Sequence, residues 1–316
     1  MNTAPHMPVM LKEVLESLGP GDGKIYVDGT FGAGGYSRAI LEAADCTVIG
    51  IDRDETACPA AEALVADFPD RFVFMPGCFG DVGALLSQAG YRGVDGFVLD
   101  IGVSSMQIDQ PERGFSFRFD GPLDMRMGRA MGGPTAADIV NEMEEADLAD
   151  VIYKYGEERH SRRVAKAIVT RRAEQRFERT SDLAGVVRSA LPFSKKDKID
   201  PATRTFQALR IAVNDELGEL ERALEASKVI LNDRGRLVVV TFHSLEDRIV
   251  KTFLRGASGH SAAVSRYAPV AEVAGPVPAF KLLGRKAVKA SDEEIAGNAR
   301  SRSAKLRAAQ RLGGGS

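Results

Sequence analysis

Three aspartates in the first third of the chain follow short apolar runs of the kind that form β-strands: Asp28, Asp52 and Asp100. The carboxyl ends of parallel strands meet at one edge of a sheet, and ligands of such sheets bind outside that edge. We therefore expect the three carboxylates to surround one cleft. A single aspartate in this position is about as often a turn or a helix cap, but three consecutive strand ends favour a binding site.

A glycine-rich loop separates the first strand from the helical pattern that follows it. The glycines of the loop are Gly29, Gly32, Gly34 and Gly35. Glycines at this junction let backbone N–H groups approach a ligand at a helix N-terminus, where the helix dipole adds partial positive charge. Asp52 lies 24 positions after Asp28, near the spacing at which a βαβ unit places a carboxylate on a ribose diol. The pattern predicts a site for a nucleoside cofactor.

The choice between cofactors depends on charge and on one small residue. Ser37 stands where the third glycine of a dinucleotide fingerprint would allow close packing of helix on strand. Three carboxylates would also repel a pyrophosphate, whereas they suit a ligand that carries a sulfonium and an ammonium. We expect S-adenosylmethionine, and an NAD(P)-dependent oxidoreductase is an alternative of another class.

Strand-like and helical segments alternate as far as residue 110, and strand-like sequence returns at Gly235–Phe242. This alternation predicts an α/β fold with a mostly parallel, doubly wound sheet. Between these parts lie a loop rich in Gly and Pro and a series of charged helical segments. We predict a discontinuous core of residues 1–110 and 200–316, interrupted by an inserted helical domain of residues 111–199.

The helix that re-enters the core should begin after Asp200, with an apolar face at helical spacing. That face contains Phe206, Leu209, Val213, Leu217 and Leu220. Residues 280–289 are expected to supply the last strands of the sheet.

The composition argues against several classes of protein. The chain has 316 residues, 44% of them hydrophobic, and no apolar run approaches the roughly 18 residues that cross a bilayer. The first residues lack the charged and apolar regions of a secretory signal. Three cysteines without CxxC spacing argue against a structural metal and for a reducing compartment. We expect a cytoplasmic protein that requires neither metal nor membrane; the oligomeric state stays open, a homodimer included.

Charge is unevenly distributed, although the net charge is only −2. Residues 1–110 carry 6 Lys or Arg against 16 Asp or Glu, residues 154–204 carry 14 against 7, and residues 281–312 carry 9 against 3. An acidic body with two basic segments fits a polyanionic partner. Solvated helix faces are the simpler explanation of such runs.

The candidate substrate contacts combine aromatic, basic and polar side chains. They are Phe115, Phe117, Arg162, Arg163, Arg210, Asn214 and His243. The two aromatics begin an alternating pattern that continues to Phe119 and either stacks an unpaired base or anchors the insertion to the core. Arg162 and Arg163 suit phosphate contacts, which position RNA without specifying its sequence.

The other polar candidates each have a structural alternative. Arg210 and Asn214 lie one helical turn apart and either point into a cleft or face solvent. His243 ends the fifth predicted strand, where it either lines the nucleotide pocket or precedes a helix with the capping box Ser244–Asp247.

Seven motifs distributed along the chain identify a family. They are Asp28–Gly35, Leu99–Gln107, Arg113–Phe117, Gly121–Met127, Tyr155–Arg159, Pro201–Ile211 and Phe242–Arg248. Together they closely resemble the bacterial RsmH (MraW) methyltransferases over nearly the whole chain. The resemblance implies a class I methyltransferase core with an inserted helical recognition domain. It also implies S-adenosylmethionine-dependent N4-methylation of a decoding-centre cytosine, cytosine 1402, in the 16S rRNA of the small ribosomal subunit.

The resemblance also implies a set of cofactor contacts. They are Gly34, Gly35, Tyr36, Asp52, Phe79, Asp100 and Gln107. Tyr36 departs from the family pattern, because many members have His at this position.

Asp100 is the candidate catalytic acceptor for a proton of cytosine N4. The motif Asp100–Val103 lacks the Pro-Pro-aromatic sequence of many amino-methyltransferases, so a role only in holding the cofactor is the alternative. A non-catalytic RNA-binding assembly factor on the same fold is the alternative function.

Overall fold

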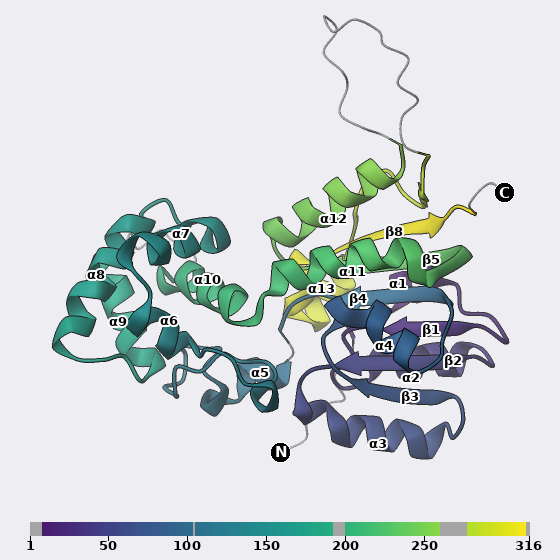
Figure 1. Ribbon diagram of the computed structural model, residues 1–316, viewed down its shortest axis with the longest axis horizontal. Helices are drawn as coiled ribbons and strands as arrows, with labels where there is room; N and C mark the ends of the chain where they lie inside the picture. The colour runs from purple at the N-terminus through teal and green to yellow at the C-terminus, as the bar shows by residue number, and fades with distance from the viewer. Residues whose placement is uncertain (1–7, 104, 192–199, 260–276, 314–316) are drawn as a thin grey trace, which may run out of the picture. The chain divides into compact units, whose positions relative to one another are not determined.

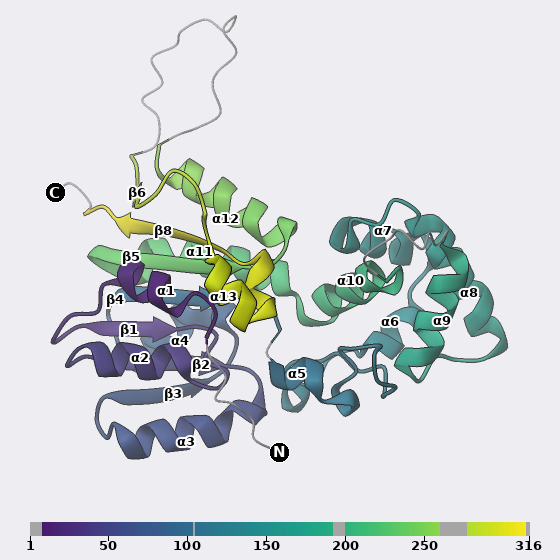
Figure 2. The same ribbon diagram turned by 180° about the vertical axis from the view of Figure 1, so that it is seen from behind.

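The computed structural model describes residues 8–103, 105–191, 200–259 and 277–313. The chain divides into two compact units, which are shown from two sides (Figure 1, Figure 2). We call Met1–Gly102 with Leu217–Ser316 the sheet unit, and Val103–Glu216 the helical unit.

The sheet unit is built on one sheet of eight strands. They are β1 (Ile25–Asp28), β2 (Thr47–Asp52), β3 (Phe72–Pro76), β4 (Val94–Asp100), β5 (Leu231–Thr241), β6 (Phe280–Leu282), β7 (Val288–Lys289) and β8 (Lys305–Arg311). Their order is β3-β2-β1-β4-β5-β8-β6, with β7 also pairing with β8. Strands β1 to β5 pair in parallel, whereas β8 is antiparallel to β5, β6 and β7. The predicted α/β fold with a mostly parallel, doubly wound sheet is confirmed.

Helices cover both faces of this sheet. They are α1 (Leu11–Leu18), α2 (Gly35–Ala43), α3 (Cys58–Asp67), α4 (Val82–Gln88), α11 (Glu216–Ile230), α12 (Ser244–Ala257) and α13 (Asp292–Gly297). Successive strand residues point to opposite faces. Accordingly Val98 joins the apolar cluster under α1, α2 and α3, whereas Phe97 and Leu99 join the cluster under α4, α11 and α12. Both faces are therefore buried, as expected of parallel strands.

The predicted last strands, within residues 280–289, correspond to β6 and β7, whereas β8 lies outside the predicted range. Lys305, Arg307 and Arg311 make this strand look like part of a basic tail. The strand forms because Leu306 and Ala309 bury their side chains on opposite faces of the sheet.

The helical unit contains six α-helices among its described residues. They are α5 (Ser105–Asp109), α6 (Ala136–Glu142), α7 (Glu145–Gly156), α8 (Ser161–Glu174), α9 (Thr180–Ala190) and α10 (Ala202–Asn214). Their buried apolar side chains form one cluster, which includes Ile152, Ile168, Leu183 and Leu209. The unit therefore has a hydrophobic core of its own.

The unit boundaries differ from the predicted domain boundaries because the predicted re-entry helix is two helices. Asp215 adopts a left-handed conformation with φ 49° and separates α10 from α11. Phe206 and Leu209 then pack in the helical unit, whereas Leu220 packs in the sheet unit. The apolar stripe that suggested one core helix thus serves two cores, and residues 200–216 belong with the insertion.

Among the described residues, every helix is too short or too polar to span a bilayer. Within the same part of the chain, His, Cys, Asp and Glu side chains form no group of three that could hold a metal ion.

Candidate functional site

The strand register places two of the three aspartates at the carboxyl edge of the sheet. Asp28 pairs with Gly50 of β2 and Val98 of β4, so Asp52 and Asp100 each lie two residues farther along their strands. Asp52 pairs with Pro76, and Asp100 with Val240. The carboxyl ends of β2, β3, β4 and β5 therefore meet at one level, with the glycine loop after β1 beside them.

Asp28 lies one level deeper and has a structural role. It is completely buried, and its two carboxylate oxygens accept hydrogen bonds from the N–H of Thr30 (3.3 Å) and the hydroxyl of Ser37 (2.8 Å). Burial raises the pKa of Asp28 to about 6. The expectation that all three aspartates surround the cleft is therefore corrected for Asp28, which braces the loop from below.

The glycine loop has no room for side chains at several positions. A Cβ on Gly29 would lie 2.6 Å from Leu99 Cδ2 and 3.3 Å from the Cβ of Phe79. Gly34 has φ 77° and stands immediately before α2, where no side chain caps the helix. The helix dipole at this end of α2 favours negative charge of a ligand.

Asp52 is tied to this loop at the end of β2. Its Oδ2 accepts the N–H of Gly32 (2.7 Å) and its Oδ1 accepts the N–H of Asp54 (2.8 Å). Burial raises the pKa of Asp52, although these two hydrogen bonds act in the opposite direction. Each oxygen keeps a lone pair for a further donor, so the fixed carboxylate is suited to the two hydroxyls of a ribose.

Asp100 also has unused hydrogen-bonding capacity. Its Oδ1 is buried and has no hydrogen-bond partner among the described residues. Burial raises the pKa of Asp100 well above the ordinary value, and the nearby carboxylates of Asp28 and Glu246 raise it further. The N–H of Asp100 donates to Thr30 Oγ1 at 2.7 Å, which joins β4 to the glycine loop. A buried acceptor that lacks a donor and a countercharge is suited to a cationic, N–H-bearing ligand.

Phe79 and Tyr36 also border the glycine loop. Phe79 follows β3 in a short 3₁₀ turn (Phe79–Asp81) and is partly buried against the apolar cluster of the α4 face. Tyr36, in the first turn of α2, is 4% exposed, and its hydroxyl donates to the carbonyl of Val9. Their contacts with a cofactor stay predictions, as does that of Gln107, which lies on α5 of the helical unit.

His243 connects β5 to α12, and the predicted capping box is wrong by one residue. Glu246, not Asp247, closes the helix start: its Oε2 accepts the N–H of Phe242 (2.7 Å) and of His243 (3.1 Å). His243 Nε2 lies 2.8 Å from Glu246 Oε1. Asp247 instead forms ion pairs with Arg307 (2.7 Å) and with Lys305 (3.1 Å) of β8. The His243–Glu246 pair thus stands at the end of β5, next in the sheet to Asp100.

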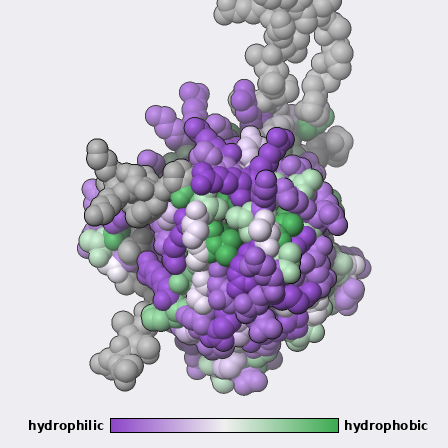
Figure 3. Space-filling model, turned by 90° about the vertical axis from the view of Figure 1, so that its left-hand side faces the viewer, coloured by the Kyte–Doolittle hydropathy of each residue, from purple (hydrophilic) through white to green (hydrophobic). Residues whose placement is uncertain are grey.

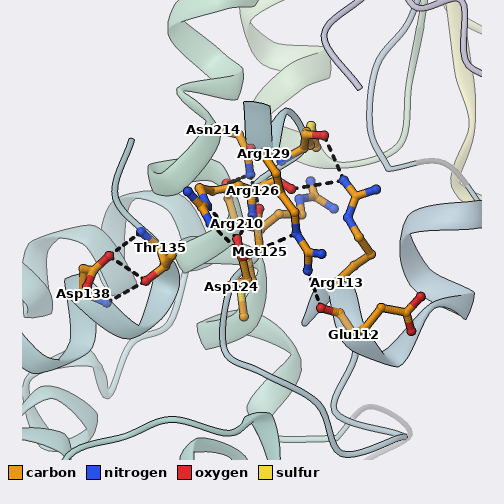
Figure 4. A network of polar contacts seen from close by, with 11 residues as sticks. Glu112, Arg113, Asp124, Met125, Arg126, Arg129, Thr135, Asp138, Arg210 and Asn214 are labelled. Carbon is orange, nitrogen blue, oxygen red and sulfur yellow. Dashed lines mark hydrogen bonds and ion pairs between the residues drawn. The ribbon is translucent and has the colours of Figure 1, made fainter. Parts of the chain in front are cut away.

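Arg210 and Asn214 belong to a polar network within the helical unit (Figure 4). Arg210 donates two hydrogen bonds to the carboxylate of Glu216 (2.7 and 2.8 Å). Asn214 accepts the N–H of Met127 (2.8 Å) and donates to the carbonyl of Met125 (2.7 Å). Both side chains are largely buried, so these contacts give them a structural role, and their predicted substrate contacts stay untested.

The three alternating aromatics have different surroundings. Phe117 packs edge-on against Phe206, with ring centroids 4.9 Å apart, and Phe115 is partly buried against the same core. Phe119 is 60% exposed. The first two rings therefore pack within the helical unit itself, and Phe119 is the ring that is open to solvent.

Cations of the helical unit fall into two groups. Arg172, Arg176 and Arg188 have partners: the carbonyls of Val140 and Met143, the carboxylate of Glu142, and the carboxylate of Asp200. By contrast, four exposed side chains around the start of α8 have no ion pair or side-chain hydrogen bond within the described residues. These four, which we call the α8 cations, are Arg159, Arg162, Arg163 and Lys166.

Two features of the site had weak signals in the sequence. Thr30 and Ser37 form hydrogen bonds with Asp100 and Asp28, respectively. Nothing in the sequence around these two hydroxyl residues indicates their partners. Arg53 forms an ion pair with Glu219 of α11 at 2.9 Å, with both side chains largely buried. A partner so far along the chain cannot be inferred from spacing.

Comparison with known proteins identifies close relatives over the full length. A model of the MraW methylase family matches residues 3–312. The chain is 60% identical over 311 residues to the ribosomal RNA small subunit methyltransferase H of Paramagnetospirillum magneticum, covering 98% of this chain and 97% of the relative. It is 62% identical over 312 residues to the protein of that name from Maricaulis maris, covering 98% and 92%.

A solved structure described as a putative rRNA-methylase from Clostridium thermocellum aligns with a TM-score of 0.44 at 10% identity, over 98% of this chain and 99% of that chain. It is too distant to bear on function. The family model and the relatives, in contrast, both extend over almost all of the sequence. The family predicted from the motifs is thereby confirmed: the chain belongs to the MraW methylase family of S-adenosylmethionine-dependent methyltransferases.

Proposed function

We propose that this protein methylates the exocyclic N4 of a decoding-centre cytosine, cytosine 1402, in the 16S rRNA of the small ribosomal subunit. The observation that carries the proposal is identity of about 60% over almost the whole length to proteins named ribosomal RNA small subunit methyltransferase H. The base, the atom and the cytoplasmic location come from the resemblance and the composition, and they are part of the proposal.

The carboxyl edge of the sheet fits the methyl donor. Asp52 would accept the ribose hydroxyls, and the glycine loop, with Gly34 and Gly35 at the start of α2, would contact the methionine portion. Asp100 Oδ1, which has no partner among the described residues, would face positive charge of the ligand. S-adenosylmethionine supplies a methyl group that is already activated for transfer, so the protein chiefly has to align donor and acceptor.

Asp100 is the proposed acceptor for an N4 proton. The N4 lone pair of cytosine is conjugated with the ring, and an acceptor at N4–H assists its pyramidalisation. Because burial raises the pKa of Asp100 well above its ordinary value, its carboxylate is a stronger base than an exposed aspartate. His243 and Glu246, at the end of the adjacent strand, would form a polar wall beside the base.

Asp100→Asn separates catalysis from cofactor binding. We expect kcat to fall at least about 100-fold at saturating S-adenosylmethionine, because general-base assistance contributes on the order of 10²–10⁴. The dissociation constant of S-adenosylhomocysteine should change less. An unchanged kcat with weakened cofactor binding would leave Asp100 the holding role only.

The α8 cations are the proposed phosphate contacts. Exposed cations without protein partners can neutralise RNA phosphates without breaking an internal ion pair. The side of the molecule shown in Figure 3 is covered mostly by hydrophilic side chains around a small hydrophobic patch. Phe119 is the proposed stacking platform, because its ring is exposed and every base offers a face to stack on.

The direct test is incubation with methyl-labelled S-adenosylmethionine and small subunits that lack the modification. We expect label in 16S rRNA, N4-methylcytidine in the nucleoside digest, and one modified fragment containing cytosine 1402. Label on another base would contradict the proposed target. RNA binding without any label would favour the assembly-factor alternative.

A further inference from the structure

Residues Pro8–Met10, which precede α1, pack against the glycine loop. A Cβ on Gly35 would lie 2.2 Å from Pro8 Cγ, so this glycine allows the segment to approach the backbone. Val9 is 4% exposed and Met10 is fully buried, in the same apolar cluster as Tyr36. The segment is therefore part of the packing around the start of α2.

Two hydrogen bonds fix this segment from opposite sides. The hydroxyl of Tyr36 donates to the carbonyl of Val9. The N–H of Met10 donates to Glu294 Oε1 at 2.6 Å, a contact between residues 284 positions apart. Tyr36 belongs to α2 and Glu294 to α13, so the segment is held between these two helices.

Met10 adopts a conformation that needs this support. Its φ is 53°, in the left-handed region that side chains other than glycine rarely occupy. Such residues persist where surrounding contacts over-determine them, and they often stand beside functional sites. The carbonyl of Met10 also accepts the N–H of Val14, and this hydrogen bond forms part of the first turn of α1.

Tyr36 connects this segment to the carboxylates of the cofactor site. Burial raises the pKa of Tyr36 well above its ordinary value, and the carboxylates of Asp100 and Asp28 raise it further. The hydroxyl therefore stays neutral and keeps its proton for Val9. The same ring thus contacts the N-terminal segment and lies within the electrostatic reach of Asp100.

We propose that Tyr36 and Glu294 are positioning residues that hold Pro8–Met10 as a wall at the methionine end of the S-adenosylmethionine site. The wall excludes water beside Gly35 at the start of α2, and exclusion of water strengthens the attraction between charged groups of the site and a charged ligand. The inference concerns only the cofactor and does not depend on which base is methylated.

The test compares two ligands that share an adenosine portion. S-adenosylhomocysteine contains the amino-acid portion, and 5′-methylthioadenosine lacks it. For Tyr36→Phe, which removes the donor, and for Glu294→Ala, which removes the acceptor, calorimetry should show about tenfold weaker binding of S-adenosylhomocysteine, the effect of losing one buried hydrogen bond. Binding of 5′-methylthioadenosine should change less than twofold. Hydrogen exchange at the amides of residues 9–14 should become faster.

Matched variants control for general loss of structure. Tyr26 is buried, and its hydroxyl accepts the N–H of Gly21 at 3.0 Å, so Tyr26→Phe removes a comparable bond at the start of β1. Glu293→Ala changes the exposed neighbour of Glu294. Both should leave the two affinities unchanged.

Equal weakening of both ligands in Tyr36→Phe would overturn the proposal, since it would indicate general destabilisation. Unchanged affinities alongside faster exchange would also overturn it. If Tyr36→Phe fails to fold, Glu294→Ala provides the same comparison. A failed rRNA methylation assay would leave these affinities interpretable, because neither ligand involves RNA.

Discussion

Charged side chains have opposite environments at the carboxyl edge of the sheet, where carboxylates are buried, and at the start of α8, where cations are exposed. Burial raises the pKa of Asp52 and Asp100 at the edge, and of Asp28 one level deeper. At α8, four cations are exposed and have no ion pair within the described residues. A buried anion without a countercharge is costly and attracts a small cation strongly at short range. Exposed cations cost little and attract a polyanion over a distance set by salt.

The comparison also separates cations within the helical unit. Arg126 and Arg210 are as basic as the α8 cations, but they pair with Asp124 and Glu216. Their charge is already used in ion pairs within the helical unit, and Figure 4 shows Arg126 beside Asp124. The sequence composition does not distinguish the paired arginines from the α8 cations. Their ion pairs in the structure indicate a structural role for the paired arginines only.

The largest effect is expected from Asp52→Ala. The variant removes a carboxylate that we assign to two ribose hydroxyls, and each charge-assisted hydrogen bond contributes about 1.5–3 kcal/mol. The affinity for S-adenosylmethionine should fall at least about 100-fold by calorimetry. Glu62→Ala, which changes an exposed carboxylate on α3, is the control and should bind normally. An unchanged affinity in Asp52→Ala would remove this residue from the ribose role.

Asp28→Asn tests the structural role of the deepest aspartate. An asparagine can accept from Thr30 and donate to Ser37 Oγ without burying a charge. The pKa of Asp28 is raised from 3.8 to about 6 in the folded state, so the wild type binds more protons when folded and loses stability as pH rises through this window. Denaturant unfolding should show the variant more stable by up to about 3 kcal/mol at pH 8, with the difference disappearing below pH 4. A difference independent of pH would contradict this explanation.

Reversing the charge of two α8 cations tests the proposed phosphate contacts. Arg162→Glu with Arg163→Glu should weaken rRNA binding by about tenfold or more and reduce the slope of log affinity against log salt by about 1–2. Arg176→Glu, which breaks the exposed ion pair with Glu142, is the matched control. Cofactor binding should stay unchanged in both. Equal RNA binding by the two variants would contradict the proposal and indicate that the α8 cations only form a solvent-exposed helix surface.

The smallest effect is expected from the aromatic loop. Phe119→Ala should weaken RNA binding by about fivefold without lowering the melting temperature, which is the lower end of the roughly 1–3 kcal/mol that stacking on one base contributes. Phe117→Ala should instead destabilise the protein by about 2 kcal/mol, since it removes the contact with Phe206. Reversed outcomes for the two rings would contradict the assignment.

Much of the sheet unit could be predicted because its signals are local. Apolar runs, glycine spacing and strand-ending aspartates located β1 to β5 and brought Asp52 and Asp100 to one edge. Asp28 could not be distinguished from them, because depth within the sheet depends on strand register. Strand β8 was missed because a short antiparallel strand with alternating basic residues looks like a tail.

The helical unit was harder to predict because its polar residues have partners far along the chain. Nothing near Asn214 in the sequence indicates that it binds the backbone of Met125 and Met127. The break at Asp215 was also hidden, since a single left-handed residue interrupts an otherwise continuous apolar stripe. In the sheet unit, the contact between Tyr36 and Val9 could likewise not be predicted, because it depends on how the chain folds.

The most direct measurement is a crystal structure of the protein with S-adenosylhomocysteine. We predict the ribose hydroxyls within hydrogen-bonding distance of Asp52 and the amino-acid portion between the glycine loop and Asp100. Density at another edge of the sheet, or a ribose away from Asp52, would contradict the assignment of this edge as the cofactor site.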